Sequence, residues 1–514
     1  MINTFALILS LTFVNSASAK LLQIIHTNDL HSFFEGTRSG LGGYARLKTV
    51  VDELRAQAEA QKIPTLFLDG GDFGEGSSFY FSNNGVDALK ALDHLGVDVS
   101  VLGNHDFILG GRELSRQMIE ADLKTKIVSA NIIGKRFMRL GRLLPSWVDY
   151  DISGMKVRVF GLTTSELHYQ YPLRPLGLIR DSHNAGIRMA RKAQKHGVDF
   201  LIALTHIGLD KDITLVRKSR TIDLVVGGHS HTKLHKPEMT RNLIGRSVPI
   251  LQAGSSSLYV GSLIMDIKPK GESVMVDYRI YDINQDIPEN QDMKKFVKEA
   301  YENREQYFNR RWDEVIGFSE IKLSGYQDGT TYETRTCWSR HIARLTREAG
   351  KTDLGLQFDV FQGEEIKAGN ITYGDMIDNF PHFRSWGDKG WKVGRATVSG
   401  FLLKKILNAM ASSELALQVT IDGLQSKIEG KTKPVAFDLK RHPVFTAMIN
   451  EEPINSMKYY SISLPSEVPH GVMKLFNVLG LVVFNNLKIV PDSDYWPLLE
   501  TYIRRNSPLR CLED

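Results

Sequence analysis

The sequence predicts an α/β protein with two domains, and two observations carry that prediction. Residues 20 to about 260 repeat short aliphatic or β-branched runs that end in glycine and polar residues, with helical patterns between several of them. Strands that alternate with helices are typical of a layered α/β domain in which most strands are buried. The chain also has 514 residues, more than one hydrophobic core usually serves, which favours a second domain.

The first domain is expected to begin with a strand and a long helix. Residues 43–62 place apolar side chains at helical spacing, which predicts an amphipathic helix. The other runs are short and bounded by glycine or polar residues, as buried strands are. In order, the expected strands are LLQIIH, PTLFLDGGD, VDVSVLGNHD, KIVSANI, KVRVFGLTT, VDFLIALTH, IDLVVGGHSH and VPILQAG.

A smaller domain of mixed α/β (α+β) character is expected to follow a connecting helix. Residues 290–312 are charged and contain no glycine or proline, which predicts that helix. The region beyond has helical patterns at 337–350 and 399–410 and strand-like runs at 415–422 and 459–464. The expected divisions are a signal peptide at 1–19, the first domain at 20–289, the linker helix at 290–312 and the second domain at 313–514.

The amino-terminal residues predict export. FALILSLTFV is a short apolar run, and Ala17-Ser18-Ala19 suits signal-peptidase cleavage before Lys20. The segment MINT before it has no lysine or arginine, and the alternative is a buried N-terminal strand or helix. The run is too short to span a bilayer comfortably, which favours a periplasmic or secreted protein without a stable membrane anchor.

Composition excludes some partners and leaves the cysteines undecided. The net charge is only +5, and no basic block with interleaved aromatic residues occurs, so we do not expect nucleic acid as a partner. Cys337 and Cys511 are the only cysteines. They could pair in an oxidising compartment or remain as two free thiols.

Polar side chains follow five of the apolar runs. Because the carboxyl ends of parallel strands meet at one edge of a sheet, we expect these side chains to share a ligand. Two pairs are spaced i, i+2, so in extended backbone both members point the same way. Taken singly, each residue could be a turn, cap or core residue. The candidate ligands are Asp29, His31, Asp72, Asn104, His206, His229 and His231.

Imidazole, carboxylate and amide oxygen together suit two divalent ions such as Zn, Mn or Fe. A shared carboxylate can bridge two cations about 3.5–4 Å apart, as in two-metal hydrolases. Such a pair would polarise an ester, neutralise phosphoryl oxygens and supply a metal-bound hydroxide. The expected reaction is therefore phosphoester hydrolysis by attack of that hydroxide on phosphorus.

Five blocks, in order, resemble the metal-binding blocks of the calcineurin-like metallophosphoesterases, in the branch of the 5′-nucleotidases and UDP-sugar hydrolases: IIHTNDLHS, LDGGDFGEGS, LGNHDF, THIGLDKD and VVGGHSH. The resemblance implies a four-layer αββα domain with Asp72 bridging two ions. It implies one ion held by Asp29, His31, Asp72 and His231, and another by Asp72, Asn104, His206 and His229. It also implies that His105 is the catalytic residue that stabilises phosphoryl charge and assists the leaving group, where negative charge develops.

One departure from the family lies beside that histidine. Relatives usually read Asn-His-Glu/Asp-Phe-Asp, and the last Asp orients the histidine, whereas this chain has Ile108 there. Without the carboxylate, the imidazole loses an orienting hydrogen bond and a reason for its pKa to stay high. Asp106 would substitute only if the local backbone differed, because it is adjacent to His105. We expect lower activity or an altered pH profile, with metal binding kept.

A second departure lies in the C-terminal domain. TDLGLQFDV, NITYGDMIDNFP and KVGRATVSGFLLKKIL resemble the family's substrate domain, but QFDVFQGEE stands where relatives read near Asn-x-Gly-Gly-x-Arg. The phosphate-side arginine is therefore missing, and no substrate-binding residue is assigned. Aromatic side chains could stack on a base or fill a core. The available ones are Phe358, Phe361, Phe380, Phe383, Trp386 and Tyr459.

The leading hypothesis is a periplasmic or secreted two-metal phosphohydrolase, 5′-nucleotidase-like, that acts on a nucleotide or another small phosphoester. A second hypothesis keeps the fold and changes the ester, to a phosphodiester, a sugar phosphate or a sulfur ester. A third is a metal-bearing binding protein with reduced catalysis, in which Ile108 marks the loss.

Overall fold

The structure is a computed structural model, and it describes residues 19–166, 173, 177–268, 273–323, 332–358, 362–380, 390–412, 419–428, 431–434, 447–466 and 487–511. Residues 1–18 of the expected signal peptide lie outside these ranges. Within the described part of the chain, no helix has both the length and the apolar character needed to cross a bilayer.

Two six-stranded sheets form the N-terminal domain. The first sheet has the order β14-β13-β1-β2-β3-β4, in which β1 to β4 run parallel and β13 and β14 add antiparallel strands at one edge. Its strands are β1 (Leu21–Thr27), β2 (Thr65–Asp69), β3 (Val99–Val101), β4 (Lys126–Val128), β13 (Tyr259–Asp266) and β14 (Val274–Asp282).

The second sheet has the order β11-β12-β10-β9-β7-β6, with four parallel strands in the centre and one antiparallel strand at each edge. Its strands are β6 (Trp147–Ile152), β7 (Met155–Thr163), β9 (Phe200–His206), β10 (Leu224–Val226), β11 (Glu238–Arg241) and β12 (Ser247–Leu251). All eight predicted runs contain a strand. The antiparallel strands β6, β11, β13 and β14 were not predicted. Strands β6, β11 and β14 lie at sheet edges, are partly exposed and lack long apolar runs, whereas β13 lies between β14 and β1 and is mostly buried.

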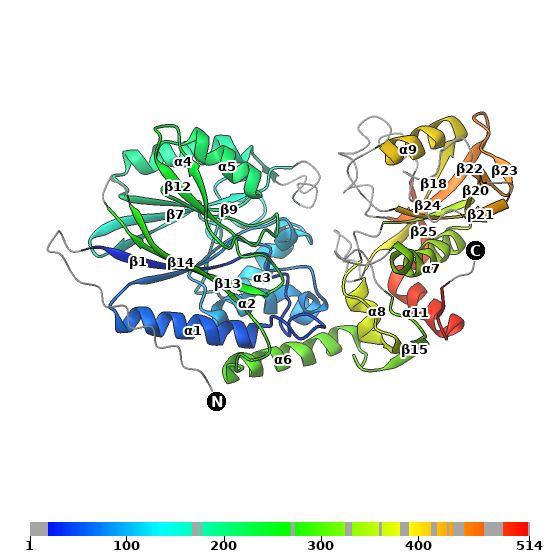
Figure 1. Cartoon of the computed structure of the whole chain (residues 1–514), viewed down its shortest axis with the longest axis horizontal. Coiled ribbons are helices and arrows are strands. Elements are labelled where there is room, and N and C mark those ends of the chain that lie inside the picture. The colour runs from blue at the N-terminus through cyan, green and yellow to red at the C-terminus, as the bar shows by residue number, and fades with distance from the viewer. Residues whose placement is uncertain are drawn as a thin grey trace.

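The two sheets pack face to face between layers of helices. Leu22 and Val101 of the first sheet share a buried cluster with Val159 and Ile202 of the second. Helix α1 (Tyr44–Ala60) covers the outer face of the first sheet, and α4 (Ser182–Lys195) and α5 (Leu209–Lys218) cover the second, as Figure 1 shows. This is the predicted αββα arrangement.

The remaining elements of this domain are short. They are η1 (Ser78–Gly85), α2 (Val86–Leu95), η2 (His105–Phe107), α3 (Gly111–Ala121), β5 (Ile132–Ile133) and β8 (Leu178–Ile179). The turn η2 matters most for function, because it begins at His105, a few residues after β3 ends at Val101.

Helix α6 (Gln291–Phe308) leads from the first domain to the second, as predicted (Figure 1). The Asn290 side chain caps it by accepting a hydrogen bond from the Met293 N–H. Near its other end, the buried Arg304 guanidinium lies over the rings of Phe79 and Trp312, 3.9 and 4.0 Å from their centroids. Met293, Phe296, Val297 and Ala300 of α6 lie in a buried cluster of the first domain, so the helix is packed against that domain.

The C-terminal domain is an α+β assembly around two antiparallel-rich sheets of order β19-β16-β24-β18-β25 and β21-β20-β22-β23. Its strands are β15 (Val315–Ser319), β16 (Leu354–Phe358), β17 (Gly369–Thr372), β18 (Lys392–Ser399), β19 (Val419–Asp422), β20 (Leu424–Ile428), β21 (Lys431–Pro434), β22 (Ala447–Ile449), β23 (Glu452–Pro453), β24 (Tyr459–Pro465) and β25 (Lys488–Asp494). Its helices are α7 (Tyr332–Gly350), α8 (Tyr373–Asn379), α9 (Gly400–Ser412) and α11 (Tyr495–Asn506).

A disulfide and a shared cluster hold this domain in place. Cys337 and Cys511 are joined, which resolves the two alternatives left open by the sequence and ties the carboxyl end to α7. The hydrophobic cluster of the C-terminal domain also includes Tyr80 and Phe81 of the first domain. The two domains therefore share buried surface beside η1.

Candidate metal centre

The predicted ligands lie at the carboxyl edges of both sheets. Asp29 and His31 follow β1, Asp72 follows β2, and Asn104 follows β3 in the first sheet. In the second sheet His206 is the last residue of β9, and His229 and His231 follow β10. Because these parallel strands end on the same side, loops far apart in sequence meet there.

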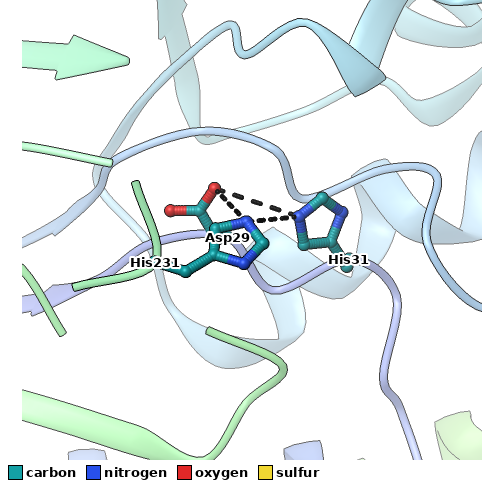
Figure 2. Close-up of side chains that lie close together, drawn as sticks. All are labelled: Asp29, His31 and His231. Atoms are coloured by element: carbon teal, nitrogen blue, oxygen red, sulfur yellow. Dashed lines mark hydrogen bonds and ion pairs between the residues drawn. The ribbon is translucent and has the colours of Figure 1, made fainter. Parts of the chain in front are cut away.

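Three of these side chains form one group, which Figure 2 shows. His231 Nε2 lies 3.2 Å from Asp29 Oδ1 and 3.2 Å from His31 Nε2. His31 Nδ1 donates a hydrogen bond to the Glu75 carbonyl oxygen at 2.6 Å, which leaves its Nε2 directed at the group. Asp29, His31 and His231 thus direct one carboxylate oxygen and two imidazole nitrogens at one place.

Asp72, His206 and His229 form the second group. His206 Nε2 lies 2.9 Å from Asp72 Oδ2, and His206 Nδ1 donates to the Gly70 carbonyl oxygen at 2.7 Å. In each group the possible ligand atoms lie within 4.8 Å of one another. The groups adjoin, since His206 Nε2 also lies 3.9 Å from Asp29 Oδ1.

The backbone at this edge departs from the extended geometry that the i, i+2 spacing predicted. Asp29, His31, Asp72, His229 and His231 all have positive φ angles, between 49° and 79°. Side chains other than glycine rarely adopt this left-handed conformation, and it costs free energy that the surrounding structure must supply. Asp29 and His31 do converge, with 3.9 Å between Oδ1 and Nε2, whereas His229 and His231 fall in different groups. The predicted extended geometry is wrong for both pairs.

Glycine permits the close approach of two of these loops. A Cβ at Gly103 would overlap the Asp72 carboxylate, and a Cβ at Gly228 would lie 2.6 Å from the Gly70 carbonyl oxygen. Any larger residue at either position would push the loop after β2 away from its neighbours.

The donor set fits divalent metal ions. Asn104 is 7% exposed, and its Oδ1 meets no hydrogen-bond donor within the described residues. A buried amide oxygen without a donor is costly in an apolar site, whereas it is a good ligand for a cation. The groups Asp29–His31–His231 and Asp72–His206–His229 supply the carboxylate and imidazole ligands that Zn, Mn and Fe accept.

Without ions, the histidines balance the buried carboxylates. Burial alone would raise the pKa of Asp29, but His206 and His231 outweigh it and lower that pKa. Burial likewise would lower the pKa of His206, yet Asp72 and Asp29 raise it to about 10. For His31 and His229, burial is the largest effect and lowers each pKa to about 4. The negative charges of the buried carboxylates are therefore balanced in part by the neighbouring histidines.

His105 lies beside the first group and has a carboxylate partner that the sequence did not reveal. Its Nδ1 contacts Glu75 Oε2, and its ring meets the His31 ring edge to face with centroids 5.0 Å apart. Burial would lower the pKa of His105, but Asp72 and Glu75 raise it to about 9. The His105 side chain is 36% exposed and Glu75 only 3%, so the imidazole is open to solvent while its partner is not.

Asp106 does not orient His105. Its carboxylate accepts the backbone N–H groups of Asp72, Gly74 and Gly103 at 2.7 to 3.0 Å. Burial and then Asp72 raise the pKa of Asp106 to about 8. Asp106 therefore holds the loop after β2 against the turn after β3. The only sequence signal for Glu75 was a glutamate three residues after Asp72.

The predicted aromatic candidates divide into core and surface. Phe358 and Phe380 are buried in the C-terminal cluster, whereas Tyr459 is 69% exposed. Phe361, Phe383 and Trp386 lie outside the described residues. The two described phenylalanines are thus core residues, and no substrate pocket is assigned.

Comparison with known proteins identifies relatives of this chain. Residues 22–233 match the calcineurin-like phosphoesterase family. A snake venom 5′-nucleotidase from Gloydius brevicauda is 31% identical over 329 residues, which cover 59% of this chain and 54% of that protein. A 5′-nucleotidase from Vibrio cholerae serotype O1 is 28% identical over 400 residues, covering 69% of this chain and 70% of that protein.

A solved structure extends the likeness across both domains. The crystal structure of a 5′-nucleotidase precursor from Thermus thermophilus covers 96% of this chain and 98% of its own, with a TM-score of 0.77 and 21% identity. That likeness concerns the fold. The chain spans about half the length of several curated relatives that it matches. The resemblance predicted from the five blocks is confirmed, as is the two-domain fold.

Proposed function

We propose that this chain, whose residues 22–233 form a calcineurin-like phosphoesterase domain, is a two-metal phosphohydrolase that acts on nucleotides or related small phosphoesters. One observation carries the proposal. Two groups of carboxylate and imidazole ligands adjoin at the shared carboxyl edge of the sheets, next to the unpaired Asn104 oxygen and the solvent-open His105.

The ligands divide between two ions. We infer that Asp29, His31, Asp72 and His231 hold one ion and that Asp72, Asn104, His206 and His229 hold the other. The inference is supported by the two three-residue groups and by His206 Nε2, which lies 2.9 Å from Asp72 Oδ2 and 3.9 Å from Asp29 Oδ1 and so brings the groups side by side. When bound, two divalent ions such as Zn, Mn or Fe polarise a phosphoester, neutralise its oxygens and lower the pKa of a water.

His105 is the catalytic residue of this proposal. The Glu75 carboxylate at Nδ1 favours the protonated imidazole, which can donate a hydrogen bond from Nε2 to a phosphoryl oxygen or to the leaving group. The partly exposed ring beside the first ligand group is placed to touch a substrate there.

We propose nucleotides as the substrate class because several relatives are 5′-nucleotidases. We propose the C-terminal domain as the part that selects among esters. The absent phosphate-side arginine keeps a phosphodiester, a sugar phosphate or a sulfur ester as alternatives. We also propose the divisions 20–289, 290–312 and 313–514, which are consistent with α6 lying between the two sets of sheets.

We propose export to the periplasm or the medium. The Cys337–Cys511 disulfide supports this, because disulfides persist in oxidising compartments and are rare in reducing ones. Amino-terminal sequencing of the mature protein should start at Lys20. A mature protein that retains Met1 would contradict cleavage.

The test is metal reconstitution followed by an ester panel. The chelated protein receives Zn, Mn or Fe, and bound metal is counted by mass spectrometry. It is then assayed with an aryl phosphate, nucleoside monophosphates, a sugar phosphate, an aryl phosphodiester and a sulfur ester. We expect metal-dependent phosphate release, lost by at least about 100-fold in Asp72→Ala and kept in Asp286→Ala, which changes an exposed carboxylate.

Two results would overturn the proposal. One is a wild-type protein that binds two ions and hydrolyses none of the esters. The other is an Asp72→Ala variant as active as wild type, because the activity would then come from elsewhere. Preference for the phosphodiester or the sulfur ester would instead select the alternative substrate class.

A further inference from the structure

We propose that Glu75, on the loop after β2, is the positioning residue for His105. It supplies the orienting carboxylate that this chain lacks at position 108. The inference rests on the proposed phosphohydrolase function. It concerns a residue that is not one of the predicted metal ligands and that acts by aiming the catalytic imidazole.

The Glu75 carboxylate is buried against the His105 ring. Glu75 is 2% exposed, and its Oε2 contacts His105 Nδ1 as an ion pair. A buried carboxylate is costly unless it is paired and hydrogen-bonded. The Glu75–His105 contact meets this condition and fixes which ring nitrogen of His105 faces inward. The other nitrogen, Nε2, is then the one left for the solvent side.

Glu75 also aims a second ring. Its backbone carbonyl oxygen accepts the hydrogen bond from His31 Nδ1 at 2.6 Å. The His31 and His105 rings meet edge to face with centroids 5.0 Å apart. One residue therefore sets the orientation of a predicted metal ligand and of the catalytic imidazole, through different atoms. Groups that orient such rings commonly change activity by about 10- to 100-fold when removed.

The other nearby acid and position 108 are engaged elsewhere. Asp106 accepts three backbone N–H groups, and Asp72 Oδ1 accepts the His105 backbone N–H at 2.8 Å rather than a ring hydrogen. Ile108 is partly buried and packs against the hydrophobic cluster shared by the two domains. The isoleucine is therefore part of the contact between domains, and the orienting carboxylate comes from another loop.

The geometry also suggests how to move the carboxylate. His105 begins the 3₁₀ turn η2, and Ile108 caps its end. Side chains three residues apart eclipse each other on a 3₁₀ helix. Position 108 is therefore one turn after His105, and an aspartate there can reach the His105 ring by turning away from the cluster that Ile108 contacts. The swap Glu75→Gln/Ile108→Asp removes the carboxylate from the loop after β2 and returns it on η2.

The experiment compares Glu75→Gln, the swap, Ile108→Asp alone and the control Glu53→Gln, which changes an exposed glutamate on α1. Each full-length variant is loaded with metal, its bound metal is counted, and kcat and KM are measured with the best ester of the panel. In Glu75→Gln we expect kcat to fall by about 10- to 100-fold with KM within about twofold and bound metal unchanged. The swap should recover most of the loss.

A second readout does not depend on turnover. In metal-free protein labelled with ¹⁵N-histidine, the Nδ1–H signal of His105, assigned by its loss in His105→Gln, should lie far downfield in wild type. It should lose that shift in Glu75→Gln and regain it in the swap. If wild type hydrolyses no ester, the proposed function fails, while this signal still tests the contact.

Three outcomes would overturn the inference. The first is a Glu75→Gln variant with wild-type kcat. The second is a loss of activity only in proportion to lost metal, because Glu75 would then act through His31. The third is a folded, metal-loaded swap variant as slow as Glu75→Gln.

Discussion

The buried histidine in the middle of the first sheet should make the N-terminal domain sensitive to acid. His26 on β1 is fully buried, its ring is stacked on Tyr278 with centroids 6.0 Å apart, and neither ring nitrogen meets a hydrogen-bond partner among the described residues. Burial lowers its pKa from 6.5 to about 3. The folded protein therefore keeps this ring neutral over a range in which the unfolded chain protonates it.

The sign and size follow from linkage. Between pH 6.5 and pH 3 the unfolded state binds more protons at this position, so stability falls as the pH falls. One pKa unit corresponds to about 1.4 kcal/mol. The loss from His26 is therefore about 3 kcal/mol at pH 4.5 and about 4 kcal/mol at pH 3.

Replacing His26 with leucine removes this term. The assay is urea unfolding of chelated, full-length protein at pH 7.5 and pH 4.5, with the change in unfolding free energy compared between variants. We expect wild type to lose about 3 kcal/mol more than His26→Leu across this interval, and His235→Leu, at an exposed histidine, to behave as wild type. Equal losses in wild type and His26→Leu, within about 0.5 kcal/mol, would refute the reasoning.

Three further predictions test the metal centre and the disulfide. Asp72→Asn should reduce bound metal below two ions per chain and lower phosphate release by at least about 100-fold. Bound metal is measured by mass spectrometry and phosphate release by the ester assay. Full metal content in this variant would contradict the bridging role. Chelation should lower the melting temperature of the N-terminal domain, since an ion present at 100 times its dissociation constant adds about 2.7 kcal/mol to the free energy of unfolding. A melting curve that does not change when Mn or Zn is added would count against the site. Replacing Cys337 and Cys511 with serine should destabilise the C-terminal domain by about 2–5 kcal/mol, because the disulfide closes a loop between residues 174 apart in sequence. Metal content should stay the same in that variant, and unaltered unfolding would refute the stabilising role.

The positions of the candidate ligands were readable from sequence because parallel strands align their ends. Asp72 and His206 each follow or end an apolar run, and the structure places them 2.9 Å apart although 134 positions separate them in the chain. The same logic predicted α1 and α6, whose apolar spacing and lack of glycine are local properties. The left-handed turns were missed, since a non-glycine residue with positive φ leaves no mark in composition.

The sequence by itself determined the class of fold, the chemistry of the ligands and the place of His105, because strand periodicity and residue type are encoded position by position. Only the tertiary structure decided what orients His105. The Glu75 side chain meets that ring because the loop after β2 folds against the turn after β3, and Ile108 turns instead to the cluster between the domains. Such partnerships depend on how separate loops pack, so no spacing along the chain predicts them.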